Sequence, residues 1–142
     1  MTQPLNVLLV EDSHGDGALV REALKSNGLA VQLYVAPDGE QALCFLRKDA
    51  PYEQAPTPDL VLLDLNIPRV HGHDVLATMR QLGLHYIPVA ILSSSSDEDD
   101  IRKAYELCAN AYLEKPLELE PYFARVRATV EYFGTYVSRL SA

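Results

Sequence analysis

The sequence predicts an α/β protein in which five parallel strands alternate with five helices. Aliphatic runs of strand length recur along the chain, at residues 5–10, where Asn6 is the one polar residue, and at residues 60–63 and 89–92. Such runs are typical of strands that are buried on both faces of a parallel sheet. Between them lie segments whose apolar residues recur three or four positions apart, which is the spacing of amphipathic helices. This alternation indicates a sheet that is covered by helices on both faces.

The first half of the chain supplies two strands and two helices before the run at residues 60–63. After the first strand, residues 16–25 pair apolar positions at i and i+4, as a helix does. Asn27-Gly28 is expected to end that helix. Residues 31–35 alternate apolar and polar side chains, which predicts a half-exposed strand, and a Pro-Asp-Gly turn then leads into the second helix.

The second half of the chain repeats this alternation after a proline-rich loop at residues 50–58. Ser95 and Glu98 have the spacing of a capping box, which predicts that a helix begins there. Strands are expected at residues 60–63, 89–92 and 111–113, and helices at residues 73–82, 97–107 and 119–140.

The topology of such a chain is restricted by the handedness of its connections. Right-handed crossovers between parallel strands favour a doubly wound sheet with the flavodoxin-like strand order 2-1-3-4-5. A chain of 142 residues is expected to form a single domain spanning residues 1–142, with an extended C-terminal helix.

Composition excludes several functions. The net charge of −8 and the pI near 4.8 oppose binding to the phosphate backbone of nucleic acids. No apolar run reaches transmembrane length and no secretory segment is evident, so we expect a cytoplasmic protein without membrane contact. Cys44 and Cys108 lack metal-ligand spacing and are expected to be reduced thiols in the core.

Residues with complementary charges follow the strands at their carboxyl ends. Glu11 and Asp12 follow the first strand, Asp64 ends the third, Ser93 follows the fourth and Lys115 follows the fifth. Because the ends of parallel strands share one edge of the sheet, these side chains are expected to meet there. Several carboxylates in one crevice need a cation, and oxygen ligands without Cys or His favour Mg²⁺. A lysine and a hydroxyl beside a metal-bound carboxylate can bind phosphoryl oxygens, and an aspartate can itself form an aspartyl phosphate.

Four stretches of the sequence resemble those of one family, the receiver domain of two-component response regulators. They are VLLVEDS with the acidic pair, PDLVLLDLNIP with the aspartate, VAILSSS with the hydroxyl and AYLEKP with the lysine. They occur in the order and spacing of the family and span nearly the whole chain. The resemblance implies a phosphoprotein that acts as a phosphorelay signalling switch and not as an enzyme. It further implies a sensor histidine kinase as phosphoryl donor and output through contacts with an unidentified downstream protein.

The resemblance also implies a role for each residue at the strand ends. Asp64 accepts the phosphoryl group from a phosphohistidine of the kinase. Glu11, Asp12, Asp64 and the backbone carbonyl of Asn66 hold Mg²⁺. Lys115 pairs with the phosphoryl oxygens.

Further implications concern the switch and the partner. Ser93, where threonine is commoner in the family, is the switch hydroxyl, and Tyr112 is the aromatic switch residue that rotates from exposed to buried. The bond before Pro116 is expected to be cis and to aim the lysine inward. The proline-rich loop and the segment NIPRVHGHDVL resemble more narrowly the response regulators of bacterial phytochromes, which implies a phytochrome as the kinase. His71 and His73 in that segment are expected in a solvated loop.

The final helix, residues 119–140, is expected to have two different contacts. Its apolar stripe follows alternating spacings of four and three, as Leu119, Phe123, Val126, Val130, Phe133, Val137 and Leu140. Such a stripe can pack on the sheet at its start and on a partner later, so we expect a homodimer. The alternative is a helix that packs only on its own domain. The candidate dimer residues are Phe123, Val130, Tyr132, Phe133 and Tyr136.

Other functions with a similar strand-end aspartate remain as alternatives. A haloacid-dehalogenase-type phosphatase needs a second aspartate two residues after its nucleophile as general acid, and Asn66 stands at that position. A toprim-like nucleotidyl site needs a paired Asp-x-Asp and a basic surface, and this acidic chain has neither. A non-phosphorylated interaction scaffold is the third alternative, although every residue type of the expected site is present.

Overall fold

The computed structural model describes the backbone of residues 4–25, 30–115 and 118–141, and the side chains of these residues as far as residue 134. Five parallel strands form one sheet in the order β2-β1-β3-β4-β5, which confirms the predicted fold class and strand order. The strands are β1 (Leu5–Val10), β2 (Val31–Ala36), β3 (Leu60–Asp64), β4 (Val89–Ser93) and β5 (Ala111–Glu114). The helices are α1 (His14–Lys25), α2 (Gly39–Arg47), α3 (Gly72–Gln81), α4 (Glu98–Glu106) and α5 (Leu119–Ser141).

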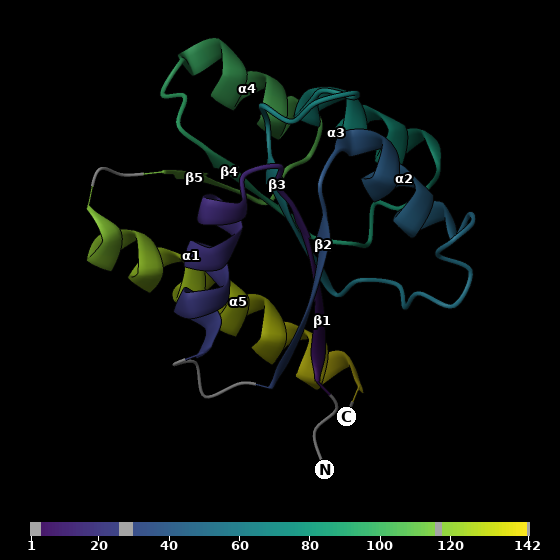
Figure 1. Ribbon diagram of the computed structural model, residues 1–142, viewed down its shortest axis with the longest axis horizontal. Helices are drawn as coiled ribbons and strands as arrows, with labels where there is room; N and C mark the ends of the chain where they lie inside the picture. Colours follow the sequence, from purple (N-terminus) through teal and green to yellow (C-terminus); the bar gives the residue numbers. More distant parts are fainter. Residues whose placement is uncertain (1–3, 26–29, 116–117, 142) are drawn as a thin grey trace.

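Helices cover both faces of the sheet. α1 and α5 lie side by side on one face, whereas α2, α3 and α4 lie on the other (Figure 1). Val61 and Leu63 of β3 enter the apolar cluster beneath α2, α3 and α4, and Leu60 and Leu62 enter the cluster beneath α1 and α5. Because successive side chains of a strand point to opposite faces, a strand covered on both faces must be apolar throughout. This is why β3 has a continuous aliphatic sequence.

The start of α3 is fixed close to the end of β3. The N–H of Gly72 donates to the carbonyl of Leu65 at 3.0 Å. A Cβ atom at Gly72 would lie 2.6 Å from Cα of Leu65 and 2.9 Å from the carbonyl oxygen of Asp64, which no side chain could accept without a backbone shift. Glycine therefore allows the helix to approach the strand end that presents Asp64.

The cap of α2 agrees with the expected turn, whereas the cap of α4 does not. Asp38 caps α2, because its side chain accepts the backbone N–H of Gln41 at 2.7 Å. The predicted capping box of Ser95 and Glu98 is wrong, because α4 begins later and its N-cap is Asp97, which accepts the N–H of Asp99. The expected Asn27-Gly28 cap lies outside the described residues.

The packing of two apolar stretches differs from the expected pattern. Val35 of β2 is 43% exposed, so the predicted alternation is not maintained to the end of this strand. Leu119 is 50% exposed, whereas Tyr122, outside the predicted stripe, is buried. The buried face of α5 therefore runs through Tyr122, Val126 and Val130 at i, i+4 and i+8, which is the spacing of one face of a straight helix.

Two further side chains, those of His73 and Cys108, lie in surroundings other than those expected. His73 is buried in the first turn of α3 instead of lying in a solvated loop, and its Nε2 is 3.1 Å from the carbonyl oxygen of Asp100 in α4. Both cysteines are free, but Cys108 is exposed because it lies in the turn after α4 with a φ of 68°.

Among the described residues, no helix combines the length and apolarity needed to cross a membrane.

Candidate functional site

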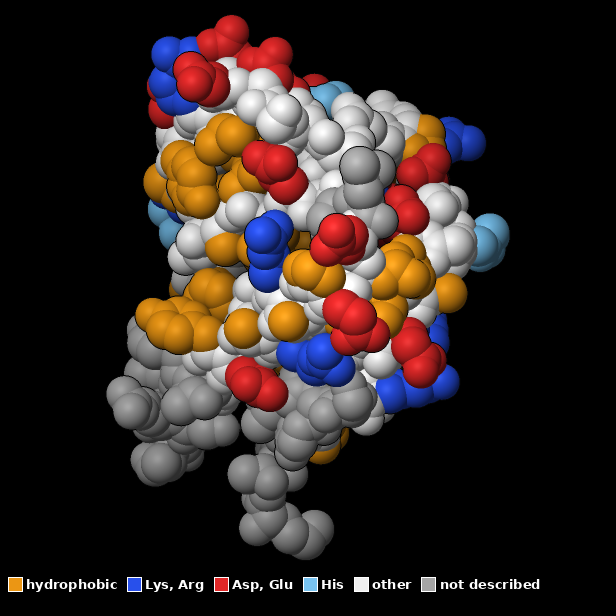
Figure 2. Space-filling view, turned by 90° about the vertical axis from the view of Figure 1, so that its left-hand side faces the viewer, with side chains coloured by type: hydrophobic (Ala, Val, Ile, Leu, Met, Phe, Trp, Pro, Cys, Tyr) orange, Lys and Arg blue, Asp and Glu red, His pale blue; other side chains and the backbone are white. Residues whose placement is uncertain are grey.

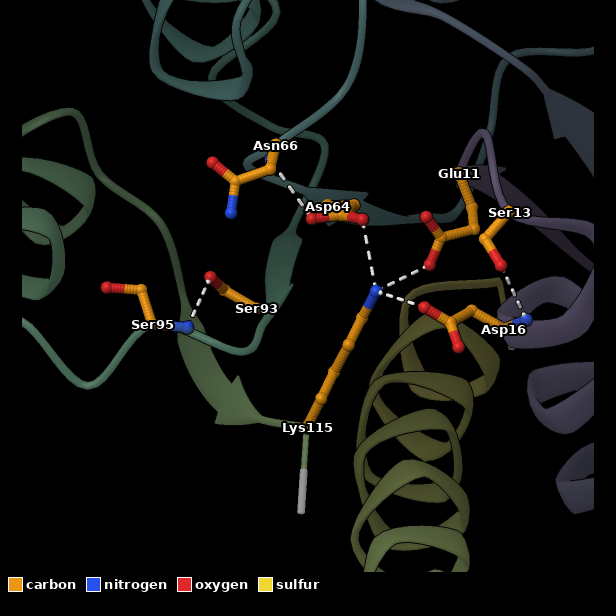
Figure 3. Close-up of polar contacts among 8 residues, drawn as sticks. All are labelled: Glu11, Ser13, Asp16, Asp64, Asn66, Ser93, Ser95 and Lys115. Atoms are coloured by element: carbon orange, nitrogen blue, oxygen red, sulfur yellow. Dashed lines mark hydrogen bonds and ion pairs between the residues drawn. The ribbon is translucent and has the colours of Figure 1, made fainter. Parts of the chain in front are cut away.

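Four strand ends bring their polar side chains to one point at the carboxyl edge of the sheet. Glu11 follows β1, Asp64 ends β3, Ser93 ends β4 and Lys115 follows β5. The ammonium of Lys115 contacts Glu11 Oε1 at 2.6 Å and Asp64 Oδ2 at 3.0 Å (Figure 3). The predicted meeting of the lysine with the carboxylates is therefore present in the structure.

Three carboxylates at this edge form a group that can hold a divalent cation. Oxygen atoms of Glu11, Asp12 and Asp64 all lie within 4.8 Å of one another. Asp12 is exposed, whereas Glu11 and Asp64 are only 3% and 6% exposed. Oε2 of Glu11 is buried and has no hydrogen-bond partner among the described residues. A buried carboxylate oxygen without a partner is costly, and a hard cation with oxygen ligands would satisfy it.

The protonation of this group is set by burial and by its neighbours. Burial, followed by the neighbouring carboxyl group of Asp64, raises the pKa of Glu11 to about 8, although Lys115 opposes the shift. Burial also acts to raise the pKa of Asp64, but the neighbouring Glu11 and hydrogen bonds from the Asn66 N–H and Lys115 outweigh it, so that this pKa lies below its ordinary value. The pKa of Lys115 is raised, because hydrogen bonds to the three surrounding carboxylates outweigh the effect of burial. Asp64 is thus an anion beside an ammonium.

The turn after β3 holds the carboxylate of Asp64 in position. The backbone N–H of Asn66 donates to Asp64 Oδ1 at 3.0 Å, while Oδ2 faces Lys115 (Figure 3). Each oxygen therefore accepts one hydrogen bond, which fixes the orientation of the carboxylate. The metal-binding role of the Asn66 carbonyl stays a prediction.

Ser93 is bonded to the loop before α4 and not to Asp64. Its side chain is completely buried, and its Oγ accepts the N–H of Ser95 at 3.1 Å (Figure 3). Ser95 Oγ in turn donates to Asp100 of α4 at 2.8 Å. The hydroxyl of Tyr112 donates to the carbonyl of Ser95 at 2.9 Å, and its ring is half-buried instead of fully exposed. Ser95 therefore connects the hydroxyl of Ser93 to α4 and to Tyr112.

One residue that the sequence analysis missed belongs to this site. Asp16, in the first turn of α1, contacts the ammonium of Lys115 at 3.0 Å. The charges of the site also act on Tyr122 of α5, whose pKa is raised to about 12, mainly by burial, with Lys115 opposing the shift. The position of Asp16 one helical turn after the acidic pair is the only sequence signal that could have found it. The predicted cis bond before Pro116 lies outside the described residues.

The chain is similar to known receiver domains over most of its length. The model of the response regulator receiver domain family matches residues 7–127. Response regulator Rcp1 of Synechocystis sp. is 43% identical over 125 residues, which are 87% of this chain and 85% of Rcp1. The matched range contains every strand end that forms the site.

Solved structures show the same arrangement of the backbone. The crystal structure of the Mn²⁺-bound form of Rcp1 has a TM-score of 0.85 with 41% identity, and the alignment covers 92% of this chain and 94% of that chain. The crystal structure of the phosphorylated cyanobacterial phytochrome response regulator RcpA has a TM-score of 0.87 with 37% identity and the same coverage, 92% and 94%. These likenesses do not favour the phosphatase, nucleotidyl or scaffold alternatives.

Proposed function

Because this chain belongs to the response regulator receiver domain family, we propose that its phosphorylation-dependent signalling depends on Asp64. In this proposal the protein acts in the cytoplasm, and Asp64 accepts a phosphoryl group from the phosphohistidine of a sensor histidine kinase. The observation that carries the proposal is the position of the Asp64 carboxylate, which is 6% exposed, with its Oδ2 3.0 Å from the Lys115 ammonium. Its place beside the unpaired oxygen of Glu11 supports a metal-dependent reaction.

The chemistry follows from the charges at the site. An oxygen of Asp64 attacks phosphorus, the new P–O bond forms as the P–N bond to the kinase histidine breaks, and the leaving imidazole takes a proton from solvent. Glu11, Asp12, Asp64 and the Asn66 carbonyl would hold Mg²⁺, which supplies positive charge for the phosphoryl oxygens. Lys115 donates to another of these oxygens. Each kinase phosphoryl group is consumed once, so the protein reacts as a partner and does not turn over as an enzyme.

Phosphorylation would then change the contacts of the β4–α4 loop. The added charge of about −1.5 to −2 attracts hydrogen-bond donors, and the Ser93 hydroxyl lies at the end of the neighbouring strand. When Ser93 turns to the phosphoryl group, it releases the N–H of Ser95, and Tyr112 loses its fixed partner in the same loop. The loop, α4 and Tyr112 then present a different surface to a downstream protein.

We further propose a phytochrome as the kinase, since RcpA, which is 37% identical, is a phytochrome response regulator. The test uses an autophosphorylated, radiolabelled phytochrome kinase. With Mg²⁺, label is expected to pass to this chain within minutes and to be lost with hydroxylamine, as an acyl phosphate is; with EDTA, no label should pass. Equally fast transfer from a kinase of another sensor class would contradict the phytochrome assignment. No label from either kinase or from a small phosphodonor would contradict the phosphoacceptor assignment.

We propose that α5 and its neighbours form a homodimer interface. Tyr132 is 70% exposed and packs edge-to-face against Phe133, with ring centroids 5.1 Å apart. A hollow of about 330 Å³ adjoins this pair and is lined by His85, Tyr86, Pro88, Asn110, Tyr132 and Phe133. Figure 2 shows the side where α4, β5 and α5 reach the surface, and hydrophobic side chains are numerous there. Val130 is completely buried in the domain's own core, and the side chain of Tyr136 lies outside the described residues.

Replacing Tyr132 by glutamate is expected to weaken the dimer. An exposed aromatic anchor contributes about 2 kcal/mol when it is central to an interface. Because the change removes this anchor from both protomers, the dissociation constant should rise at least about 30-fold. Sedimentation equilibrium at micromolar concentrations, with and without phosphodonor, measures this dissociation constant. Val35→Gln, on the opposite edge strand, should leave the mass unchanged. A monomeric wild-type protein under both conditions would contradict the proposal.

A further inference from the structure

The ammonium of Lys115 is surrounded by three carboxylates, one more than the sequence predicts. It lies 2.6 Å from Glu11 Oε1, 3.0 Å from Asp64 Oδ2 and 3.0 Å from Asp16 Oδ2 (Figure 3). An ammonium has three donors and no acceptor. Each of its donors therefore has one carboxylate partner, and the Lys115 side chain is only 17% exposed. The lysine is fully engaged.

Asp16 differs from the other two partners in position. It projects from the first turn of α1, where its backbone N–H donates to the Oγ of Ser13 at 3.1 Å. Its side chain is 42% exposed, against 1% for Glu11 and 8% for Asp64. It does not belong to the group of carboxylates that can hold a metal, which consists of Glu11, Asp12 and Asp64.

The lysine and a metal ion need the same two buried carboxylates. Glu11 and Asp64 both bond to Lys115 and both belong to the metal-binding group. A divalent ion there would lie within a few ångströms of the ammonium, where like charges repel strongly in a partly buried site. For both cations to remain, Lys115 must weaken its bonds to Glu11 and Asp64 and keep a partner outside the metal group. Asp16 is the one contact of Lys115 among the described residues that meets this condition.

We infer that Asp16 is a positioning residue that holds Lys115 at the site when the metal occupies Glu11 and Asp64. Without it, the ammonium has only metal ligands as partners and competes with the metal for them. With it, the lysine remains in place to meet the phosphoryl group while the metal binds. This inference rests on the proposed function, because it assigns the lysine and the metal to the same reaction.

A double-mutant cycle with Mg²⁺ alone as the ligand tests the inference by calorimetry, without phosphoryl transfer. Asp16→Asn is expected to weaken Mg²⁺ binding about fivefold to tenfold, which is within the range of couplings between contacting residues. In a Lys115→Met background the same change should weaken it by no more than about twofold, because no ammonium remains to compete. Equal losses in the two backgrounds would show that Asp16 acts only through its charge and would overturn the inference.

Matched variants separate this role from a general effect of charge or helix stability. Glu22→Gln removes one negative charge from α1 at a residue whose ion pair is with Lys25, and should leave Mg²⁺ affinity within about twofold. Asp16→Glu should restore most of the affinity. Full retention of affinity in Asp16→Asn would overturn the inference, whereas a wild-type protein that binds no Mg²⁺ would overturn the proposed function with it.

A second measurement does not depend on the Lys115 variant. In ¹⁵N-lysine-labelled protein loaded with Mg²⁺, the ammonium of Lys115 is expected to exchange its protons slowly because it is held by Asp16. The slow signal should be lost in Asp16→Asn and kept in Glu22→Gln. An unchanged signal in Asp16→Asn would show that another group holds the lysine.

Discussion

Replacing Asp64 by asparagine is expected to abolish phosphoryl labelling by a small phosphodonor in the presence of Mg²⁺. The amide is a poor nucleophile, and it also removes one of the three carboxylates that can bind the metal. The fold should survive, because the amide oxygen of asparagine can still accept the backbone N–H of Asn66, which Asp64 accepts at 3.0 Å. Its free energy of unfolding is expected to change by no more than about 1 kcal/mol. Mass spectrometry of the intact protein measures labelling, and thermal unfolding measures stability.

Asp49→Asn is the matched control for this experiment. Asp49 is exposed and lies just after α2, at the opposite end of the helix from the strand-end carboxylates. Its variant should label at the wild-type rate. Undiminished labelling of Asp64→Asn would remove Asp64 from its role, and equal loss in both variants would point to a general effect of charge.

Mg²⁺ affinity is expected to fall about tenfold for each pH unit below 8, because the metal must displace a proton from Glu11. The pKa of Glu11 is raised to about 8 by burial and by the neighbouring carboxyl group of Asp64. Asp64, whose pKa is lowered, is ionised throughout this range. Calorimetric titrations between pH 6 and pH 8.5 should therefore show affinity rising about a hundredfold and then levelling. Titrations in buffers of different ionisation enthalpy should show release of about one proton at pH 6.

The metal-free protein should show the opposite trend in stability. Folded Glu11 keeps its proton up to about pH 8, whereas an ordinary glutamate loses it near 4.5, so the folded state binds more protons between these values. The free energy of unfolding should therefore decrease as the pH rises from 4.5 to 8 and recover when Mg²⁺ is added. In Glu11→Gln both pH dependences should disappear, and metal binding should be weaker at every pH. An affinity that is constant from pH 6 to pH 8 in the wild type would contradict the shifted pKa.

The fold and the central site residues could be predicted because they follow from local patterns. The aliphatic run of β3 identifies a doubly covered strand, and right-handed crossovers then leave few strand orders. Since parallel strands end at one edge, the positions of Glu11, Asp64 and Lys115 in the sequence were sufficient to bring them together. That residues 1–142 form one domain, and that these residues have the roles proposed, stay predictions.

The structure differs from the sequence-based predictions where side-chain burial or contacts depend on how the helices are rotated against the sheet. The stripe through Leu119 and Phe123 fits a heptad, but a straight helix on a sheet buries Tyr122 instead. His73 is buried because α4 packs against α3, where the carbonyl oxygen of Asp100 accepts a hydrogen bond from the His73 ring. Asp16 meets Lys115 only because α1 and the end of β5 lie on the same side of the acidic edge.

The sequence by itself therefore determined which segments form strands and which charged residues stand at their ends, since both are properties of single segments. Tertiary structure alone decided that Asp16 shares the ammonium of Lys115 and which side of α5 is buried. These contacts depend on distances between segments far apart in the chain, such as the 99 positions between Asp16 and Lys115. Such distances are set by the packing of two apolar clusters, whose side chains must fill space without voids.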